Sequence, residues 1–402
     1  MDQAFQPYPP LIDGRPHRNC RAVVIIPARN EEHTLPAGLE ALRLQCDPMD
    51  RPIPHDIYEV VLLLNNCTDA SPEVARRYQQ EHPGFHLHIA ERTLPPEAAH
   101  VGTARRLLMD TAFQRLQAGP HVHTAILSTD ADTTVSRDWV YRNLRAIEDG
   151  AEAVGGVIHL KPEDVDFLDA GTLRAYRNDR LYQQHVARLE SLLDPDPDDP
   201  WPRHLEHFGA SLACTPAAYR RAGGLPPVKP LEDVAFVDAL RRVDARLRHA
   251  PEVSIHTSAR LDGRAEVGLS GQLRHWQEDS AAGRAHLVQS AESLAHRFSS
   301  LARLRRLWKL EELPELAQLP ESWREPLADS HPRRLSQAAF LASIDCNRLI
   351  SETFHGKGEG EIAQVIADLA QRIDSLISTS SPAHPGESVP AAATEPLAIP
   401  AG

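Results

Sequence analysis

The stretch Arg21-Ala-Val-Val-Ile-Ile-Pro-Ala-Arg-Asn-Glu-Glu32 decides the fold of this chain. It begins with β-branched apolar residues, which predict a buried strand that ends near Pro27, and its polar end leads into a helix that opens near Thr34. The stretch Tyr58-Glu-Val-Val-Leu-Leu-Leu-Asn-Asn-Cys-Thr-Asp-Ala-Ser71 repeats this plan, with a helix predicted from Pro72. The two stretches together predict a strand–helix–strand unit with parallel strands.

A third apolar run leads directly into two carboxylates. Thr124-Ala-Ile-Leu127 is followed closely by Asp130-Ala-Asp132. Paired carboxylates after a buried strand offer hard oxygen ligands, suited to Mg²⁺ or Mn²⁺ that bridges the phosphates of a nucleotide, although the pair alone also suits a solvated turn. Because the carboxyl ends of parallel strands meet at one edge of a sheet, we expect residues 27–31, 65–69 and 130–132 to share one pocket.

These motifs resemble those of family-2 glycosyltransferases of the GT-A fold. The resemblance extends over about residues 20–260 and includes two further motifs, Val101-Gly-Thr-Ala-Arg-Arg106 and Leu231-Glu-Asp233. It implies an α/β fold with a Rossmann-like mixed sheet flanked by helices. It also implies an enzyme that moves a hexose from a nucleotide diphosphate sugar to an acceptor hydroxyl, with a divalent metal and with inversion. Two alternatives stay open, namely a retaining GT-A transferase that acts on a small organic acid and a catalytically inactive GT-A binding module.

The resemblance also implies a nucleotide-sugar site. Pro27, Arg29 and Glu31 are expected near the base and ribose, and Asn65 stands where the family more often has an aspartate that reads a uracil edge. An amide both donates and accepts, so it can pair with a base, and uridine and guanosine both stay open. The predicted site is completed by Gly102, Thr103, Arg105, Asp130, Gly209, Arg260 and Arg264.

Further expectations concern three segments in or beside the predicted site. The first turn of the helix at Gly102 and Thr103 is expected to favour an anion. Arg260 and Arg264 belong to a basic, glycine-containing loop that is suited to closing over a diphosphate and is also compatible with a solvated surface loop. Thr68 and Asp69 are expected only to cap a helix.

The metal ligands follow from the family pattern. It makes Asp132 the direct ligand and Asp130 its partner at the ribose or at a metal-bound water, and His256 resembles a third ligand. Imidazole suits Mn²⁺, but a lone histidine is equally compatible with a core or capping role. The predicted cofactor is therefore Mg²⁺ or Mn²⁺.

Glu232-Asp233 is the candidate for the catalytic base. In inverting family members the acidic residue at this position deprotonates the acceptor hydroxyl, so Asp233 is the predicted base, with Glu232 as its neighbour and substitute. A carboxylate in this role must reach the nucleophile on the face opposite the leaving diphosphate. The pair also suits the first turn of a helix, and both readings can hold together.

Composition limits the partners and the location of the protein. The 402 residues include 43 Lys and Arg against 56 Asp and Glu, a formal net charge of −13, so no general attraction to nucleic acid is expected. The five cysteines are scattered, which predicts no disulfide framework and a cytoplasmic location. A membrane-spanning helix needs about eighteen consecutive apolar residues, and no apolar run in the sequence is that long. The sequence therefore predicts a soluble protein without an integral membrane segment.

The chain is expected to divide into four parts. These are an N-terminal arm (1–19), the GT-A catalytic domain (20–271), a helical extension (272–378) and a disordered tail (379–402), with amphipathic helices at 283–307, 336–354 and 361–377. The apolar stripe of the last helix must be buried on the body of the protein or on a second subunit, which makes a homodimer through these helices one expectation. No motif identifies the acceptor.

Overall fold

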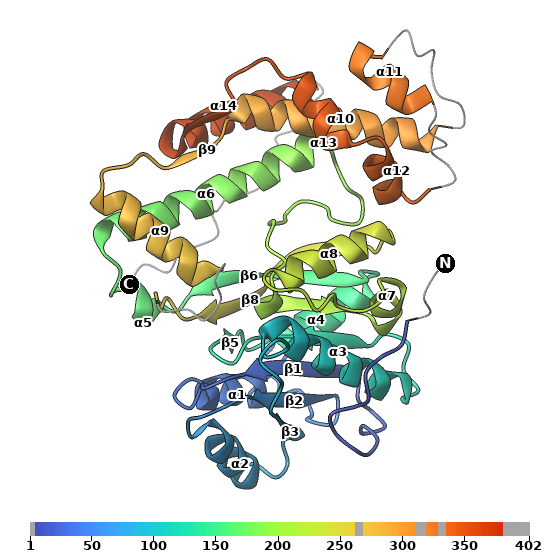
Figure 1. Cartoon of the computed structure of the whole chain (residues 1–402), viewed down its shortest axis with the longest axis vertical. Helices are drawn as coiled ribbons and strands as arrows, with labels where there is room; N and C mark the ends of the chain where they lie inside the picture. The colour runs from blue at the N-terminus through green and yellow to red at the C-terminus, as the bar shows by residue number, and fades with distance from the viewer. Residues whose placement is uncertain (1–4, 262–267, 311–318, 329–334, 381–402) are drawn as a thin grey trace.

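The computed structural model describes residues 5–261, 268–310, 319–328 and 335–380. Figure 1 shows a sheet with helices on its two faces in one half of the molecule and a stack of helices in the other half. No helix in these ranges has both the length and the apolar character needed to cross a lipid bilayer. All five cysteines lie within the same ranges, and none of them forms a disulfide there.

The described residues form an eight-stranded mixed sheet. Its strand order is β3 (Leu87–Arg92), β2 (Tyr58–Asn65), β1 (Ala22–Ala28), β4 (Ala125–Ser128), β7 (Leu212–Cys214), β6 (Ala153–Leu160), β8 (Leu247–Thr257) and β5 (Thr134–Val135). The first four strands run parallel, β7 is antiparallel to both of its neighbours, β6 and β8 are parallel, and β5 closes the edge antiparallel to β8. This confirms the predicted α/β class with a mixed sheet flanked by helices.

The register of the parallel strands fixes where the polar segments lie. Ala28 is paired with Leu64, and Ile25 is paired with Ser128, so β1, β2 and β4 all end at the same edge of the sheet. Residues 22–26 are buried, as a strand covered on both faces requires. The polar segments that follow these three strands therefore emerge together, as the sequence predicted.

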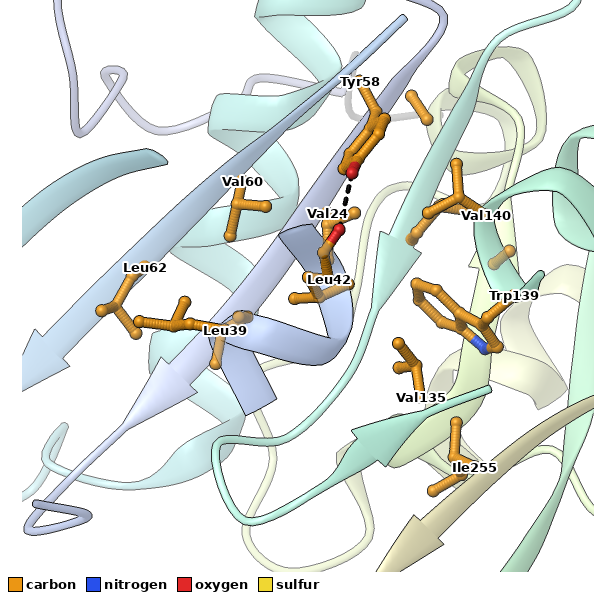
Figure 2. Packing of buried hydrophobic residues seen from close by; sticks show 14 of the residues in the cluster. Val24, Leu39, Leu42, Tyr58, Val60, Leu62, Val135, Trp139, Val140 and Ile255 are labelled. Atoms are coloured by element: carbon orange, nitrogen blue, oxygen red, sulfur yellow. Dashed lines mark hydrogen bonds between the residues drawn. The ribbon is translucent and has the colours of Figure 1, made fainter. Parts of the chain in front are cut away.

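Helices cover both faces of the sheet. One face carries α1 (Leu35–Arg43), α2 (Ser71–Glu81) and α4 (Trp139–Glu148), and the other carries α3 (Val101–Gln117), α7 (Pro216–Arg221) and α8 (Glu232–Arg242). Figure 2 shows the first face, where the Oη of Tyr58 donates a hydrogen bond of 2.5 Å to the carbonyl of Leu42. The fully buried Trp139 donates from Nε1 to Ser211 Oγ at 3.1 Å, so its polar group is satisfied. The core thus anchors the strands whose ends form the candidate site.

The second half of the molecule is mostly helical. It contains α5 (Pro162–Val165), α6 (Ala170–Leu193), α9 (Leu269–Ala281), α10 (Ala291–Lys309), α11 (Glu321–Ala328), α12 (Gln337–Ser343), α13 (Cys346–Glu352), α14 (Ile362–Ser380) and a small sheet of β9 (Leu287–Gln289) with β10 (Glu359–Glu361). The helix predicted at 361–377 is present as α14.

Two predicted helices in this half have different bounds. The helix expected at 283–307 begins only at Ala291, because β9 pairs with β10 and Ser290 Oγ caps α10 by accepting from the N–H of Ser293. The helix expected at 336–354 is interrupted at Asp345, whose φ of 46° ends one helix and starts another. The first difference depends on a pairing between distant segments, which local periodicity does not reveal.

The apolar stripe of α14 is covered within the same chain. Ile362, Val365, Leu369 and Ile373 are buried in a cluster with side chains of α6 and α10. Figure 1 shows the three helices lying together. The homodimer and the division of the chain at residue 271 both stay predictions, and α6, from the part assigned to the catalytic domain, shares this cluster with the C-terminal helices.

Leu369→Ala is expected to lower the free energy of unfolding by about 2–5 kcal/mol, because it leaves a cavity in place of the fully buried Leu369 side chain. Gln371→Ala, at an exposed position of the same helix, is the matched control. Urea denaturation followed by circular dichroism measures both changes. Equal stability of the two variants would show that α14 does not pack on the body as described.

Candidate functional site

Asp130 and Asp132 lie in a tight turn at the carboxyl edge of the sheet. The turn starts directly after β4, where the N–H of Thr129 donates to the carbonyl of Ile25 at 3.1 Å, and it closes where the N–H of Thr133 donates to the carbonyl of Asp130 at 3.2 Å. The side chains of Asp130 and Asp132 are 35% and 18% exposed. The turn therefore presents two adjacent carboxylates that solvent can reach in part.

Arg105 joins this turn to the acidic pair of α8. Its Nη2 donates to Asp130 Oδ1 at 2.5 Å, and its Nη1 donates to Glu232 Oε1 at 2.8 Å. The Arg105 side chain is only 3% exposed, so the planar guanidinium is a fixed link between two carboxylates. Burial raises the pKa of Glu232, and Arg105 offsets only part of that rise. The link brings the predicted metal turn and the predicted base into one site.

Asp233 is held by backbone groups. Its Oδ2 accepts from the N–H of Gly209 at 2.8 Å, and its Oδ1 accepts from the N–H of Val234 at 2.8 Å. Asp233 is half-buried, whereas Glu232 is buried beside Arg105. Both acids lie in the first turn of α8, which begins after the left-handed residue Leu231. The structural reading of the pair is thus correct, and it fixes the Asp233 carboxylate toward the site.

Gly209 leaves space for the Arg105 guanidinium. A Cβ at this position would overlap the Nη1 and Cζ atoms of Arg105. The Gly209 carbonyl accepts from Ser128 Oγ at 2.8 Å, so its backbone is tied to the end of β4 while its N–H binds Asp233. Gly209, predicted to contact the nucleotide sugar, therefore has a positioning role in the structure.

Gly209→Ala is expected to displace the Arg105 guanidinium from Asp130 and Glu232. It should lower the melting temperature and impair donor binding, because buried carboxylates lose their counter-charge. Gly84→Ala is the control, since a Cβ at Gly84 meets no neighbouring atom within 4 Å. Differential scanning calorimetry and calorimetric titration measure the two effects. If both variants behave as wild type, Arg105 does not need this space.

The segment that carries Gly209 is supported by a buried imidazole network. Asp199 Oδ2 lies 2.6 Å from His249 Nδ1, and His249 Nε2 lies 3.0 Å from His207 Nδ1. Burial, with a further contribution from the His249 charge, lowers the pKa of His207 to about 3. A neutral His207 two residues before Gly209 therefore helps to fix this backbone. None of the motifs that predicted the site includes these residues.

A second arginine joins Asp132 to Glu31. Nη2 of Arg260 lies 2.8 Å from Asp132 Oδ2 and 2.9 Å from Glu31 Oε1, and its Nη1 lies 3.3 Å from Glu31 Oε2. Glu31 is buried and also accepts from Thr34 Oγ1 at 2.8 Å. Burial and the neighbouring Asp130 raise the pKa of Asp132 to about 6, against the opposing charge of Arg260. Two guanidinium groups thus compensate the carboxylates of this edge.

Other predicted donor-side residues lie at the same edge. Pro27 is in the last part of β1, and Asn65 is the buried last residue of β2. Arg29 is exposed, with Nη1 donating to the carbonyl of Ala99 at 3.4 Å. Arg264 lies outside the described residues.

The first turn of α3 is capped by a side chain that the sequence analysis did not consider. The N–H of Thr103 donates to His100 Nδ1 at 3.4 Å, and Thr103 Oγ1 lies 3.1 Å from His100 Nε2. Gly102 allows close approach, because a Cβ there would overlap the carbonyl of Val228. The predicted anion site at Gly102 and Thr103 therefore has an imidazole in contact with its polar groups.

The polar loop after β2 braces the loop after β1. Asp69 Oδ1 accepts from the N–H of Ser71, and its Oδ2 accepts from the N–H of Glu32, both at 3.1 Å. The N–H of Thr68 donates to Asn30 Oδ1 at 2.7 Å. Asp69 binds the start of α2, as the capping prediction requires, whereas the hydrogen bonds of Thr68 link its loop to Asn30.

His256 lies on β8 opposite Thr134 of β5, which follows the Asp130-Ala-Asp132 turn. Its ring centroid is 5.4 Å from that of His159, and burial lowers the pKa of His256, which favours the neutral imidazole. Within the described ranges, no group of three or more His, Cys, Asp and Glu side chains is arranged to hold a metal ion. The structure thus does not group His256 with the two aspartates, and its role as a ligand stays a prediction.

Residues 23–196 match the model of glycosyl transferase family 2. The match covers β1, β2, β4 and the Asp130-Ala-Asp132 turn, so the part of the chain that forms this edge of the sheet is similar to family-2 glycosyltransferases. Sequence comparison with curated proteins gives no significant match.

Several solved structures are similar to the chain at low identity. The mannosyltransferase PcManGT from Pyrobaculum calidifontis, solved with GDP-Man and Mn²⁺, is 19% identical over 87% of this chain and 91% of its own, with a TM-score of 0.41. TarS 1–349 from S. aureus, solved with UDP, is 14% identical over 84% of this chain and 93% of its own, with a TM-score of 0.36. GalNAc-T7, solved with UDP, GalNAc and Mn²⁺, is 11% identical over 83% of this chain and 56% of its own, with a TM-score of 0.42. These likenesses are too weak to place a ligand in this chain.

Proposed function

We propose that this protein is a divalent-metal-dependent, inverting glycosyltransferase that moves a hexose from a nucleotide diphosphate sugar to an acceptor hydroxyl. The observation that carries the proposal is the Arg105 bridge, with 2.5 Å to Asp130 and 2.8 Å to Glu232. This buried guanidinium joins the carboxylate turn proposed to bind the metal to the acidic pair proposed to supply the base. Metal-assisted transfer with inversion requires both a cation site and a base beside the same donor.

The donor is proposed to lie along the carboxyl edge of β1, β2 and β4. Pro27, Arg29 and Asn65 would face the base and ribose, since they end the first two strands or directly follow them. The diphosphate would lie near Asp130 and Asp132. The base and the hexose are left to experiment.

The carboxylates fit a divalent cation. Asp130 and Asp132 each hold a guanidinium at 2.5–2.8 Å, so both positions already accept positive charge. Mg²⁺ and Mn²⁺ are commonly bound through one or two carboxylates together with substrate phosphates, so a cage of three protein ligands is not needed. When bound, the cation would neutralise the charge that develops on the departing diphosphate. His256 is proposed as an additional ligand from the neighbouring strand.

Asp233 is proposed as the base. Its carboxylate would take the proton of the acceptor hydroxyl as the acceptor oxygen bonds to the anomeric carbon and the sugar–phosphate bond breaks, with the electron pair leaving on the diphosphate. The N–H groups of Gly209 and Val234 orient this carboxylate. Attack from the face opposite the diphosphate inverts the anomeric configuration. Glu232 remains paired with Arg105 and holds α8 in register with the metal turn.

A thermal-shift panel of nucleotide diphosphate sugars, each with and without Mn²⁺, tests the donor and the metal together. A ligand that binds only the folded state raises the melting temperature. We expect at least one uridine or guanosine diphosphate sugar to stabilise the protein in the presence of Mn²⁺ and much less in its absence. If no nucleotide sugar shifts the melting temperature with either Mn²⁺ or Mg²⁺, the proposal fails.

Analysis of the product anomer by NMR then separates inversion from retention. An inverted anomer supports Asp233 as the base. A retained anomer favours the alternative in which a GT-A enzyme glycosylates a small organic acid. A cytoplasmic location also stays a prediction, based on five cysteines that form no disulfide in the described residues.

A further inference from the structure

Arg260 occupies the position of a cation between two carboxylates of the donor side. Its Nη2 lies 2.8 Å from Asp132 Oδ2 and 2.9 Å from Glu31 Oε1. We propose that Arg260 is the resident counter-cation of the metal site: it neutralises Asp132 and Glu31 in the ligand-free protein and gives up Asp132 to the divalent cation when the donor binds. The inference rests on the proposed function and identifies Arg260 as the group that competes with the divalent cation for the Asp132 carboxylate.

The contacts of Arg260 and of a metal ion on Asp132 are mutually exclusive at short range. A divalent cation bound to Oδ2 of Asp132 would lie within a few ångströms of Nη2, and like charges at that separation repel strongly in a partly buried site. Asp132 is 18% exposed, so water screens this repulsion only in part. Metal binding in the absence of nucleotide must therefore displace the guanidinium.

Glu31 gives Arg260 a place to remain during the exchange. Nη1 and Nη2 of Arg260 lie 3.3 and 2.9 Å from the two carboxylate oxygens of Glu31, so this pair persists when the contact with Asp132 breaks. The Arg260 side chain is 34% exposed, which leaves it room to turn toward an incoming anion. A nucleoside diphosphate supplies oxygens that a guanidinium binds well and also brings negative charge that offsets the cation.

Arg105 has no such freedom. Its side chain is 3% exposed and bridges Asp130 and Glu232, so we expect it to keep its contacts when the donor binds. The two aspartates of the turn therefore differ, with Asp130 paired to a fixed arginine and Asp132 paired to an exchangeable one. This difference assigns the opening of the metal position to Arg260.

The exchange predicts coupled binding. The wild-type protein should bind Mn²⁺ at least about tenfold more tightly with UDP or GDP than alone, and by linkage Mn²⁺ should tighten the nucleotide by the same factor. Electron paramagnetic resonance of free Mn²⁺ measures the metal directly, and calorimetric titration of UDP and GDP measures the reciprocal term. Equal Mn²⁺ affinity with and without a nucleotide that binds would overturn the proposal without any variant.

Arg260→Gln isolates the charge. It should bind Mn²⁺ alone about tenfold more tightly than wild type, because Asp132 then has no resident cation, and the coupling to the nucleotide should shrink. Arg260→Lys keeps the charge without the planar fork and should bind Mn²⁺ alone less tightly than Arg260→Gln does. Arg76→Gln is the control. Arg76 lies on α2 and forms an exposed ion pair with Glu91 of β3, so removing its charge should leave the Mn²⁺ affinity unchanged.

The outcomes separate this inference from the proposed function. If wild type binds Mn²⁺ only with nucleotide and a folded Arg260→Gln binds Mn²⁺ alone no better, Arg260 is not the competing cation and only the exchange fails. If wild type binds no Mn²⁺ with either nucleotide, the metal-dependent function fails together with the exchange. Circular dichroism of each variant shows that the comparison concerns folded protein.

Discussion

Asp233→Asn is expected to lower turnover by about a hundredfold or more while donor affinity stays nearly unchanged. The amide has the shape of the carboxylate, but it lacks the basicity needed to take the proton of an acceptor hydroxyl. Its carbonyl oxygen can still accept from the N–H of Gly209, a bond of 2.8 Å in the structure, and only the bond from the N–H of Val234 is lost. A loss in kcat without a loss in donor binding is the pattern of an interaction made only in the transition state.

Glu232→Gln is the matched comparison for this prediction. It removes the charge that Arg105 binds at 2.8 Å in a buried position, so it should lower the melting temperature more than Asp233→Asn does. Steady-state kinetics, calorimetric titration of the donor and thermal denaturation separate the two roles. If Asp233→Asn keeps near wild-type turnover and Glu232→Gln abolishes it, the base is Glu232.

Asp132→Ala is expected to abolish Mn²⁺-dependent nucleotide binding while the fold survives. A carboxylate that coordinates the cation matters far more to the ligand than to stability. Removing Asp132 leaves Arg260 paired with both oxygens of Glu31, so the guanidinium is not left without a counter-charge. The melting temperature should therefore change little.

Asp149→Ala provides the control, because Asp149 forms an exposed ion pair with Arg145 at the end of α4. It removes the same charge from the surface and should leave nucleotide binding intact. Isothermal titration of UDP and GDP with Mn²⁺ measures both variants. Unchanged affinity in Asp132→Ala would remove Asp132 from the metal site.

The sequence predicted the strands that define the site and their common edge. Residues 22–26 and 60–64 are continuous apolar runs, which is the pattern of parallel strands buried on both faces, and polar residues follow each run closely. Once the strands are parallel, their carboxyl ends must meet at one edge. The grouping of residues 27–31, 65–69 and 130–132 thus followed from local pattern and geometry.

The ion pairs of the site could not be predicted from the local sequence pattern. Arg105 lies 127 residues before Glu232, and Arg260 lies 229 residues after Glu31. No local periodicity encodes contacts over such distances, so both arginines were predicted only as ligands of the nucleotide sugar. The requirement for glycine at residue 209 depends on the position of Arg105 and was hidden for the same reason.

The central claim is that the Asp130-Ala-Asp132 turn and Asp233 form one active site for glycosyl transfer. The most direct test is the release of nucleoside diphosphate from the donor chosen by thermal shift, with wild type and Asp233→Asn compared in Mn²⁺ and in excess EDTA. We expect release by wild type in Mn²⁺, loss of release in EDTA, and release by Asp233→Asn that is slower by about a hundredfold. A wild-type protein that binds the donor but releases no more nucleoside diphosphate than Asp233→Asn does, whether with an acceptor or with water, would contradict this proposal. That result would favour a catalytically inactive GT-A binding module.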